Sequence, residues 1–501
     1  MRRVITNLLL SVSMILASVA LLAVGLPDRT PLAQAAAGDF PNCRTGVGVV
    51  LNSIGTYDIA PMRLGWYVNW TAPLAPIEPA GVEFYFTLRA KQSKSGSTYL
   101  PSYQITPTLT FDPGTGLGPI VQANLGGVWL IGNEPDRPYS QDDVMPDMYA
   151  QIYHDAYTFI KSIDPTARVA NGAIVQPTPL RLQYLDMVRD AYEAKFDVSM
   201  PIDVFNVHAY MIDEIKNMPG ADIPPGINAT TGTLFTKPQH LDVNVFAGLM
   251  QSLRAWMNAN GYRDVPLIVT EYGALYPLWF LDDFGLSQAS INNYISAVVG
   301  WANTATDAAT GYRADNNRLV QQVALFSLDD DSLFPPPTND FRWGSFLFRS
   351  TAPYTLTSTG AFYRDTIAAG LTAGVDLTPY AFVLDPSVPI VTPPGTITVT
   401  FKARVSNTGN SSPPSGAVVR FYDTTAGGNV LLGEATLPVF TGCGAWREAS
   451  VQWPNLAAGF HVLRVEVDPD GLLSETNESN NVVTLTVFIP TQAVFLPSVQ
   501  R

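Results

Sequence analysis

The sequence is poor in charge and in the side chains that most often bind zinc. Only 14% of its 501 residues are charged, while 47% are apolar, so the chain can build a large core and does not have the composition of a disordered protein. It has four histidines, and neither of its two cysteines, Cys43 and Cys443, lies among other metal-type ligands. This shortage argues against a zinc site, and we expect neither a metal nor a cofactor.

Positive charge is also scarce. Against 43 Asp and Glu the chain has 29 Lys and Arg, which gives a net charge of −14 without any basic stripe. An acidic surface repels phosphate backbones, so we expect no binding to nucleic acid.

The N-terminus has the pattern of an export signal. Two arginines precede a mostly apolar stretch at residues 8–26, and "LAQAAAG" then offers small-residue cleavage sites after Ala35 or Ala37. We predict a signal peptide at residues 1–35; the alternative is an uncleaved membrane anchor. No other segment is long and apolar enough to span a bilayer, so either reading places the body of the protein outside the cytoplasm, secreted or at the cell surface.

Export makes a disulfide between Cys43 and Cys443 chemically permissible. The sequence does not show whether the two residues are close in space. A disulfide and two unrelated free thiols remain equal alternatives.

Between residues 45 and 375, eight apolar, β-rich runs alternate with helical patterns. The runs are residues 63–70, 82–89, 103–111, 127–132, 167–175, 202–210, 265–273 and 321–328. Near-continuous apolar strands are typical of a parallel sheet buried on both faces, and eight alternations predict an α/β fold, the (β/α)₈ or TIM barrel. An open doubly wound sheet is the second choice, because no glycine-rich phosphate loop follows an early strand.

The helix after the fourth run is the best marked. Apolar residues from Tyr149 to Ile163 follow the i, i+3, i+4, i+7 spacing of one buried face. Asp164-Pro165 is expected to end this helix.

The amino-acid composition and the pattern of apolar residues change beyond residue 375. Residues 376–395 are proline-rich and predict a linker, residues 396–489 alternate in the manner of a small all-β, immunoglobulin-like sandwich, and residues 490–501 form a tail. This break predicts a barrel that folds and acts without the sandwich.

Two glutamates stand at the ends of predicted strands. Glu134 follows the fourth run in "GNEP", and Glu271 ends the seventh in "VTEYG". A barrel gathers the C-terminal ends of its strands at one rim, so both carboxylates are expected in one pocket. Glycosidic cleavage needs such a pair, with carboxyl groups about 5–5.5 Å apart in a retaining enzyme. A solvated loop residue is the alternative for either glutamate taken alone.

These segments resemble the clan of retaining glycoside hydrolases whose acid/base follows strand 4 and whose nucleophile ends strand 7. "GNEP" and "VTEYG" match the two catalytic segments, and "VHAY" is similar to a His-x-Tyr at strand 6. The resemblance implies that Glu134 is the general acid/base, that Glu271 is the nucleophile, and that Asn133 binds the sugar 2-hydroxyl. It also implies a raised pKa for Glu134 and an ionised Glu271.

The same resemblance suggests further substrate-binding residues. His208 and Tyr210 lie two apart on a strand and so point the same way, Tyr210 toward the nucleophile and His208 toward sugar or acid. The alternative is that both are buried core residues at the top of the barrel, with their hydrogen bonds made within the protein. Arg89, at the end of the second run, is a candidate for the clan's arginine near the nucleophile, although no motif surrounds it. Trp70 and Trp343 are candidate stacking platforms for sugar rings.

The C-terminal region resembles the CARDB type of bacterial adhesion-related sandwich, through "VSNTGNSS" and "VDPDGLLSETNESNN". Four acids in the second segment could hold calcium, and a polar hairpin with solvated acids is the favoured alternative. They are Asp468, Asp470, Glu475 and Glu478.

The sequence thus predicts a secreted, monomeric retaining glycosidase acting on a β-linked poly- or oligosaccharide. The alternative from another class is a non-catalytic glycan-binding or adhesive surface protein on a degenerate barrel. A metal-dependent barrel hydrolase comes third, because histidines are few. The sugar, the linkage and endo or exo action cannot be read from the sequence.

Overall fold

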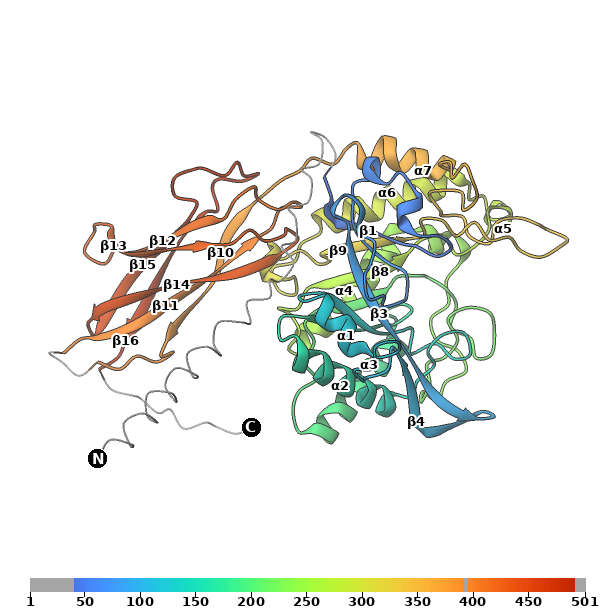
Figure 1. The fold of residues 1–501 in the computed structure, drawn as a ribbon, viewed down its shortest axis with the longest axis horizontal. Helices are drawn as coiled ribbons and strands as arrows, with labels where there is room; N and C mark the ends of the chain where they lie inside the picture. The colour runs from blue at the N-terminus through green and yellow to red at the C-terminus, as the bar shows by residue number, and fades with distance from the viewer. Residues whose placement is uncertain (1–39, 392–394, 492–501) are drawn as a thin grey trace, which may run out of the picture. The chain divides into compact units, whose positions relative to one another are not determined.

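The computed structural model describes residues 40–391 and 395–491 (Figure 1). The predicted signal peptide and nearly all of the predicted tail lie outside these residues, so both stay predictions. Within the described residues, no helix has the length and apolarity needed to cross a membrane.

Eight parallel strands build the N-terminal domain. They pair in the order β6-β5-β3-β2-β1-β9-β8-β7, and isolated bridges between Ala170 and Val204 and between Ile174 and Val207 join the two ends. The strands are β1 (Asn42–Gly48), β2 (Leu64–Val68), β3 (Glu83–Ser95), β5 (Val128–Asn133), β6 (Arg168–Ala173), β7 (Phe205–His208), β8 (Leu267–Tyr272) and β9 (Gln322–Phe326). The predicted α/β barrel is confirmed as a near-closed one.

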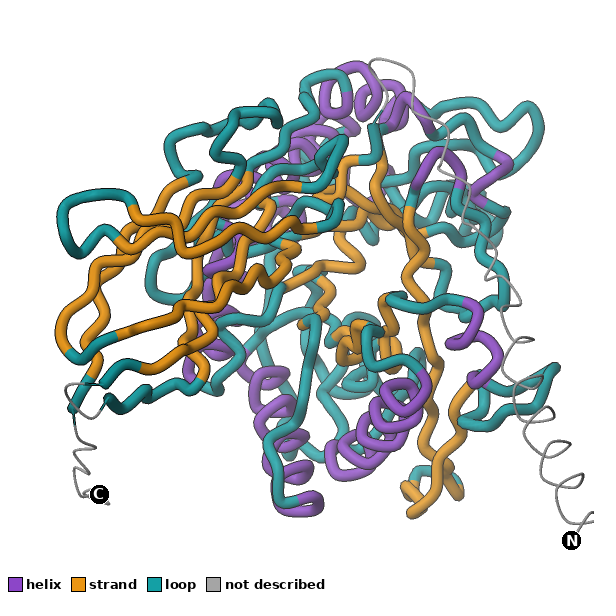
Figure 2. Tube along the Cα trace, turned by 60° about the vertical axis from the view of Figure 1, so that its left-hand side comes forward, coloured by secondary structure: helices purple, strands orange, loops and turns teal. Residues whose placement is uncertain are grey.

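Helices follow most of these strands and lie outside them (Figure 2). They are α1 (Leu117–Ala123), α2 (Pro146–Ile163), α3 (Pro179–Phe196), α4 (Val243–Ala259), α5 (Leu278–Asp282), α6 (Gln288–Thr304) and α7 (Ser358–Phe362). Short 3₁₀ turns occupy η1 (Ile54–Thr56), η2 (Ala60–Met62), η3 (Pro79–Gly81), η4 (Lys237–Leu241) and η5 (Arg313–Asp315), and η6 (Tyr363–Ala368) is a π-helix. The helix predicted up to residue 163 is α2, with Asp164 at its C-cap.

The strand count from sequence contained two errors that cancel. The first barrel strand, β1, was missed because "NCRTGVG" has no apolar run; a Cβ on its Gly46 would lie 2.4 Å from the Trp66 ring, so only glycine fits there. The run at 103–111 was counted although its strand, β4 (Thr98–Thr106), only pairs antiparallel with β3. Glu134 therefore still follows the fourth barrel strand and Glu271 still lies on the seventh.

The barrel interior is a packed core. In β5, Val128 and Leu130 belong to a cluster separate from the one that contains Trp129 and Ile131, as the alternation of a strand between inside and outside requires. The inner cluster consists of Trp66, Val68, Tyr85, Val128, Leu130, Ala170, Val204, Ile268 and Ala324. Because these side chains fill the middle, a ligand can enter only at a rim.

The C-terminal domain is the predicted all-β sandwich. One sheet has the order β10-β11-β14 and the other β13-β12-β15-β16 (Figure 1). The strands are β10 (Leu377–Asp385), β11 (Ile397–Asn407), β12 (Ala417–Asp423), β13 (Val430–Leu437), β14 (Ala445–Leu456), β15 (Gly459–Val467) and β16 (Val482–Ile489). Alternate residues such as Phe401 in β11 and Phe421 in β12 form the buried core between the sheets.

The linker predicted at 376–395 is wrong in its first half. Residues 377–385 form β10, which pairs antiparallel with β11. Proline misled the prediction: Pro379 lies at a register shift of an edge strand, where a missing N–H costs no ladder bond.

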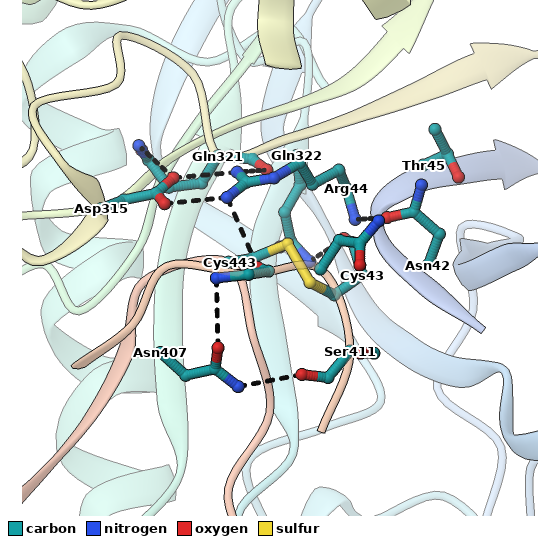
Figure 3. The surroundings of a disulfide bond; sticks show 12 residues. Asn42, Cys43, Arg44, Thr45, Asp315, Gln321, Gln322, Asn407, Ser411 and Cys443 are labelled. Atoms are coloured by element: carbon teal, nitrogen blue, oxygen red, sulfur yellow. Dashed lines mark hydrogen bonds and ion pairs between the residues drawn. A yellow bond between two sulfur atoms is a disulfide. The ribbon is translucent and has the colours of Figure 1, made fainter. Parts of the chain in front are cut away.

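A disulfide and a hydrogen bond from a buried arginine join the barrel to the sandwich. Cys43, in β1, is bonded to Cys443 of the sandwich (Figure 3). Next to it, the Arg44 guanidinium donates to both Asp315 carboxylate oxygens, at 2.8 and 2.9 Å, and to the Thr408 carbonyl at 2.8 Å. The two cysteines are thus a pair. Removing the sandwich would cut the disulfide and the Arg44 contact with the Thr408 carbonyl but leave Asp315 in place, and a barrel that folds alone stays a prediction.

The four acids proposed for calcium are engaged in other contacts. Asp468 accepts from the backbone N–H groups of Leu472 and Leu473, and Asp470 pairs with Arg420 at 2.8 Å. Glu475 accepts from the Asn481 amide at 2.9 Å, and Glu478 accepts from the Glu475 N–H at 3.1 Å. These contacts favour the polar-turn alternative.

Removing the disulfide is expected to lower the free energy of unfolding by about 2–4 kcal/mol, because the bond constrains the unfolded chain. A Cys43→Ala/Cys443→Ala double variant should show this as a lower denaturant midpoint than the oxidised protein. The reduced protein is the matched control and should unfold with the double variant. Two free thiols in a mass spectrum taken without reductant, or unchanged midpoints, would contradict the prediction.

Candidate active site

Glu134 and Glu271 come together at the C-terminal rim of the barrel. Glu134 directly follows β5 and is 1% exposed; Glu271 lies in β8 and is 6% exposed. A carboxylate oxygen of each and a ring nitrogen of His208, which ends β7, all lie within 4.8 Å of one another. Three strands thus deliver three buried titratable groups to one point.

The Glu134 carboxylate has two cationic or potentially cationic neighbours. His208 Nδ1 lies 3.0 Å from Oε1, and Arg137 Nη1 donates to Oε2 at 3.0 Å. The backbone of Glu134 has φ +46°, a left-handed turn that brings Arg137 back over the carboxylate three residues later. The turn after β5 therefore carries its own counter-ion.

A buried ion pair fixes this turn. The Asp136 carboxylate contacts Arg181 of α3, and both side chains are fully buried. Arg181 also donates to the carbonyls of Ala221 and Asp222, in the loop that follows β7. Because one guanidinium binds both loops, the acid-bearing turn is held against the loop beyond His208.

Glu271 is held by three groups. Trp70 Nε1 donates to its Oε1 at 2.8 Å, the Tyr210 hydroxyl donates to its Oε2 at 2.6 Å, and His208 Nε2 lies 3.2 Å from Oε1. His208 therefore stands between the two glutamates, with one ring nitrogen facing each. These contacts orient the Glu271 carboxylate on a rigid strand.

The charges around the two glutamates give them opposite pKa shifts. Burial alone would raise the pKa of Glu134, but the Arg137 charge and the His208 hydrogen bond outweigh burial and hold this pKa well below its ordinary value. Burial, reinforced by the neighbouring Glu134 charge, raises the pKa of Glu271. Burial would lower the pKa of His208, but the Glu271 and Glu134 carboxylates raise it.

The expected raised pKa of Glu134 is therefore wrong for the site without substrate. The expectation ignored Arg137, which the sequence places only three residues further on. With a positive His208, the four groups Glu134, Glu271, His208 and Arg137 sum to zero charge, which suits a buried site.

The pair lies in a cavity of about 520 Å³, a size typical of small-ligand sites. Seven of the eight predicted site residues line the cavity, and the eighth, His208, is buried and contacts both carboxylates. The lining residues are Val50, Trp70, Arg89, Asn133, Glu134, Arg137, Gln141, Tyr210, Ile212, Pro219, Gly220, Glu271, Leu275, Tyr276, Pro277, Phe326, Phe334 and Trp343. Aromatic rings and a few polar groups thus face the carboxylates.

Two of the predicted residues line the cavity but donate to side chains other than the two glutamates. Arg89 is in β3 and donates to Asp142 at 2.7 Å and to Gln141 at 3.1 Å, with no contact to Glu271. Asn133 donates to Gln141 at 3.2 Å. Arg89 is therefore not the arginine beside the nucleophile that was expected from the clan.

Trp343 lies in the loop after β9, where its Nε1 donates to Asp330 at 2.5 Å. Trp70 follows β2 rather than the first barrel strand, since β1 precedes it, and its direct bond to Glu271 was not predicted. Sequence reasoning also missed Arg137, although "NEPDR" shows a cation within reach of a glutamate three residues earlier.

Among the described residues, Glu134, His208 and Glu271 form the one group of acids, histidines and cysteines close enough to hold a metal ion. The arrangement fits proton handling better. Each ring nitrogen of His208 faces a carboxylate, so the imidazole can exchange a proton with either glutamate.

Comparisons with known proteins agree with the two-domain architecture. Residues 376–485 match the CARDB family model. This confirms the resemblance of the C-terminal domain. No curated protein matches the chain.

Among solved structures, the chain is similar to several glycoside hydrolases. A GH128 (subgroup I) endo-β-1,3-glucanase from Amycolatopsis mediterranei, in complex with laminaritriose, is 19% identical over 66% of this chain and 100% of that one, with a TM-score of 0.40. A monomeric β-xylosidase from Caulobacter crescentus is 14% identical over 87% of this chain and 98% of that one, with a TM-score of 0.41. The CARDB domain of a Pyrococcus furiosus protein, in complex with di-metal ions, is 22% identical over 24% and 99% of the two chains, with a TM-score of 0.20. At these scores the likenesses carry no argument about the reaction, which rests on the site.

Proposed function

We propose that the chain is a secreted retaining glycoside hydrolase that cleaves O-glycosidic bonds of a β-linked poly- or oligosaccharide by double displacement. The observation that carries the proposal is the buried pair Glu134 and Glu271, which line one cavity with one carboxylate oxygen of each within 4.8 Å of the other. Retaining enzymes hold their carboxyl groups about 5–5.5 Å apart, whereas inverting enzymes need about 6.5–9.5 Å to admit a water. The β linkage is taken from the clan that the motifs resemble.

Each glutamate has a distinct role. Glu271 attacks the anomeric carbon and forms a glycosyl ester as the glycosidic C–O bond breaks and the leaving oxygen takes a proton from Glu134. A water, deprotonated by Glu134, then displaces Glu271 and releases the sugar with its original configuration. Tyr210 and Trp70 hold the nucleophile, and Asn133, which lines the cavity, binds the sugar 2-hydroxyl as in the clan that the motifs resemble.

The proton for the first step comes from His208. Glu134 is ionised in the free site, but His208 carries a proton on Nδ1, 3.0 Å from Glu134 Oε1. Passing that proton through Glu134 to the leaving oxygen makes His208 neutral just as Glu271 becomes a neutral ester. The net charge of Glu134, Glu271, His208 and Arg137 thus stays at zero in both states, which avoids an unpaired buried charge.

The test is hydrolysis by residues 36–501 of a panel of chromogenic and polymeric β-glycans, with the first-formed anomer followed by NMR. We expect products of retained configuration from at least one glycan, and none from a Glu271→Gln control of the same shape. A glycan-binding protein on a degenerate barrel would bind without releasing reducing ends.

The pH profile of kcat/KM should be bell-shaped. Activity needs Glu271 ionised, so it falls as pH drops through the Glu271 pKa, which lies above the ordinary 4.5. It also needs the His208 proton, so it falls as pH rises through the His208 pKa, which lies above the ordinary 6.5. Replacing Arg137 with Gln removes a positive charge that disfavours the proton, so the alkaline limb should move up by about one pH unit.

The matched control is Arg342→Gln, which removes an exposed arginine that contacts neither glutamate. Its alkaline limb should stay in place. An Arg137→Gln limb that stays in place or moves to lower pH would contradict the proposed proton path.

A further inference from the structure

A second hollow lies beside the candidate active site. It has a volume of about 270 Å³, and Trp343 lines both it and the main cavity. Its other walls come from α5, the start of α6, the loop after β9 and the start of α7. The lining residues are Leu278, Trp279, Gln288, Asp340, Phe341, Trp343, Gly344, Phe346, Arg349, Thr357, Ser358 and Thr359.

The walls combine aromatic faces with polar groups. Trp279 is 42% exposed although it is a large aromatic side chain. The Arg349 guanidinium lies 4.1 Å from the Phe341 ring centroid and 5.3 Å from that of Phe346. Within the part of the chain that the structure describes, Arg349 pairs with no carboxylate, so its N–H donors are available to a ligand.

This combination suits a sugar unit. The C–H faces of a sugar ring pack on aromatic rings, while its hydroxyls accept from a guanidinium and exchange hydrogen bonds with hydroxyl groups such as that of the exposed Ser358. The wall carries both the negative Asp340 and the positive Arg349, so it has no net charge with which to select a charged sugar. A neutral glycan therefore fits the hollow best.

Because the second hollow adjoins the main cavity at Trp343, one glycan chain can occupy both. Trp343 is fixed between the two hollows by its bond to Asp330 and by Phe326, whose ring centroid lies 6.0 Å away. A chain bound over Glu134 and Glu271 that runs past Trp343 reaches Trp279 and Arg349. We propose that the second hollow is an additional subsite, which binds a further unit of the same neutral glycan and selects polymeric over short substrates. The proposal rests on the proposed glycosidase function.

The test compares Trp279→Ala and Arg349→Gln with the wild-type chain on laminari-, cello- and xylo-oligosaccharides of increasing length and on a 4-nitrophenyl β-glycoside. We expect kcat/KM on the longest oligosaccharide that is cleaved to fall about 10-fold, with little change on the aryl glycoside. Phe284→Ala, which removes an exposed aromatic residue near α5 that does not line the hollow, is the matched control and should change neither.

A binding measurement separates this proposal from the function it rests on. In a Glu271→Gln background, calorimetry with the same oligosaccharides should show about 10-fold weaker binding for Trp279→Ala with the longest chain only. Equal effects on long and short ligands, or none on either, would overturn the subsite. A wild-type chain that binds long glycans through Trp279 but cleaves none would instead overturn the glycosidase function and leave the subsite standing.

Discussion

Replacing Glu271 with Ala should reduce turnover of every cleaved glycan by about 10⁴-fold or more, including aryl glycosides with excellent leaving groups. The reason is that, among the described residues, Glu134 is the one other carboxylate in this group, and the proposed reaction needs it as the acid/base. Glu83→Ala, which removes the half-buried carboxylate at the opposite, N-terminal end of β3, is the matched control and should leave turnover within about twofold.

Azide should partly restore the Glu271→Ala variant, because the small anion can occupy the vacated space. It would attack the anomeric carbon directly and give a glycosyl azide of inverted configuration. If the Glu271→Ala variant kept more than about one tenth of wild-type turnover, Glu271 would not be the nucleophile.

Replacing Glu134 with Ala should reduce turnover of natural glycans by about 10²–10⁴-fold, the usual contribution of a general acid/base. Dinitrophenyl glycosides need no proton, so their first step should be spared and a burst of released phenol should appear. Azide should then speed the second step, which no longer has a base, and give a product of retained configuration. Steady-state release and product NMR measure the two effects.

The stereochemistry of the two azide products also tests the assignment of roles. Burial raises the pKa of Glu271 and Arg137 lowers that of Glu134 in the free site, which is the reverse of the usual order for a nucleophile and an acid. If the roles were exchanged, Glu134→Ala would give the inverted azide and Glu271→Ala the retained one.

The sequence predicted the barrel well because the buried strands of a parallel sheet leave a continuous apolar signal. It failed where a strand carries no such signal. In β1, Gly46 is needed for the close approach of Trp66, so this buried position of the strand has no apolar side chain that could indicate a strand in the sequence. In β10, an edge strand accepts Pro379, and proline is otherwise the strongest sign of a linker.

The sequence predicted which residues form the candidate site better than it predicted their pKa shifts and contacts. Motifs placed Glu134, Glu271, His208 and Tyr210 because strand ends of a barrel share a rim. The sequence could not show that His208 faces both glutamates or that Arg137 folds back over Glu134, since both depend on loop geometry. Nor could it show the Cys43–Cys443 bond, which joins residues 400 positions apart.

The most direct test of the double displacement is to trap the glycosyl-enzyme. A 2-deoxy-2-fluoro glycoside of a sugar that the protein cleaves, carrying a good leaving group, should inactivate the full chain and add one sugar mass. Peptide mapping by mass spectrometry should then find that mass on the peptide that contains Glu271. A label on the Glu134 peptide would show that Glu134 is the nucleophile and Glu271 the acid/base. An active enzyme that accumulates no label and releases product of inverted configuration would contradict the retaining mechanism.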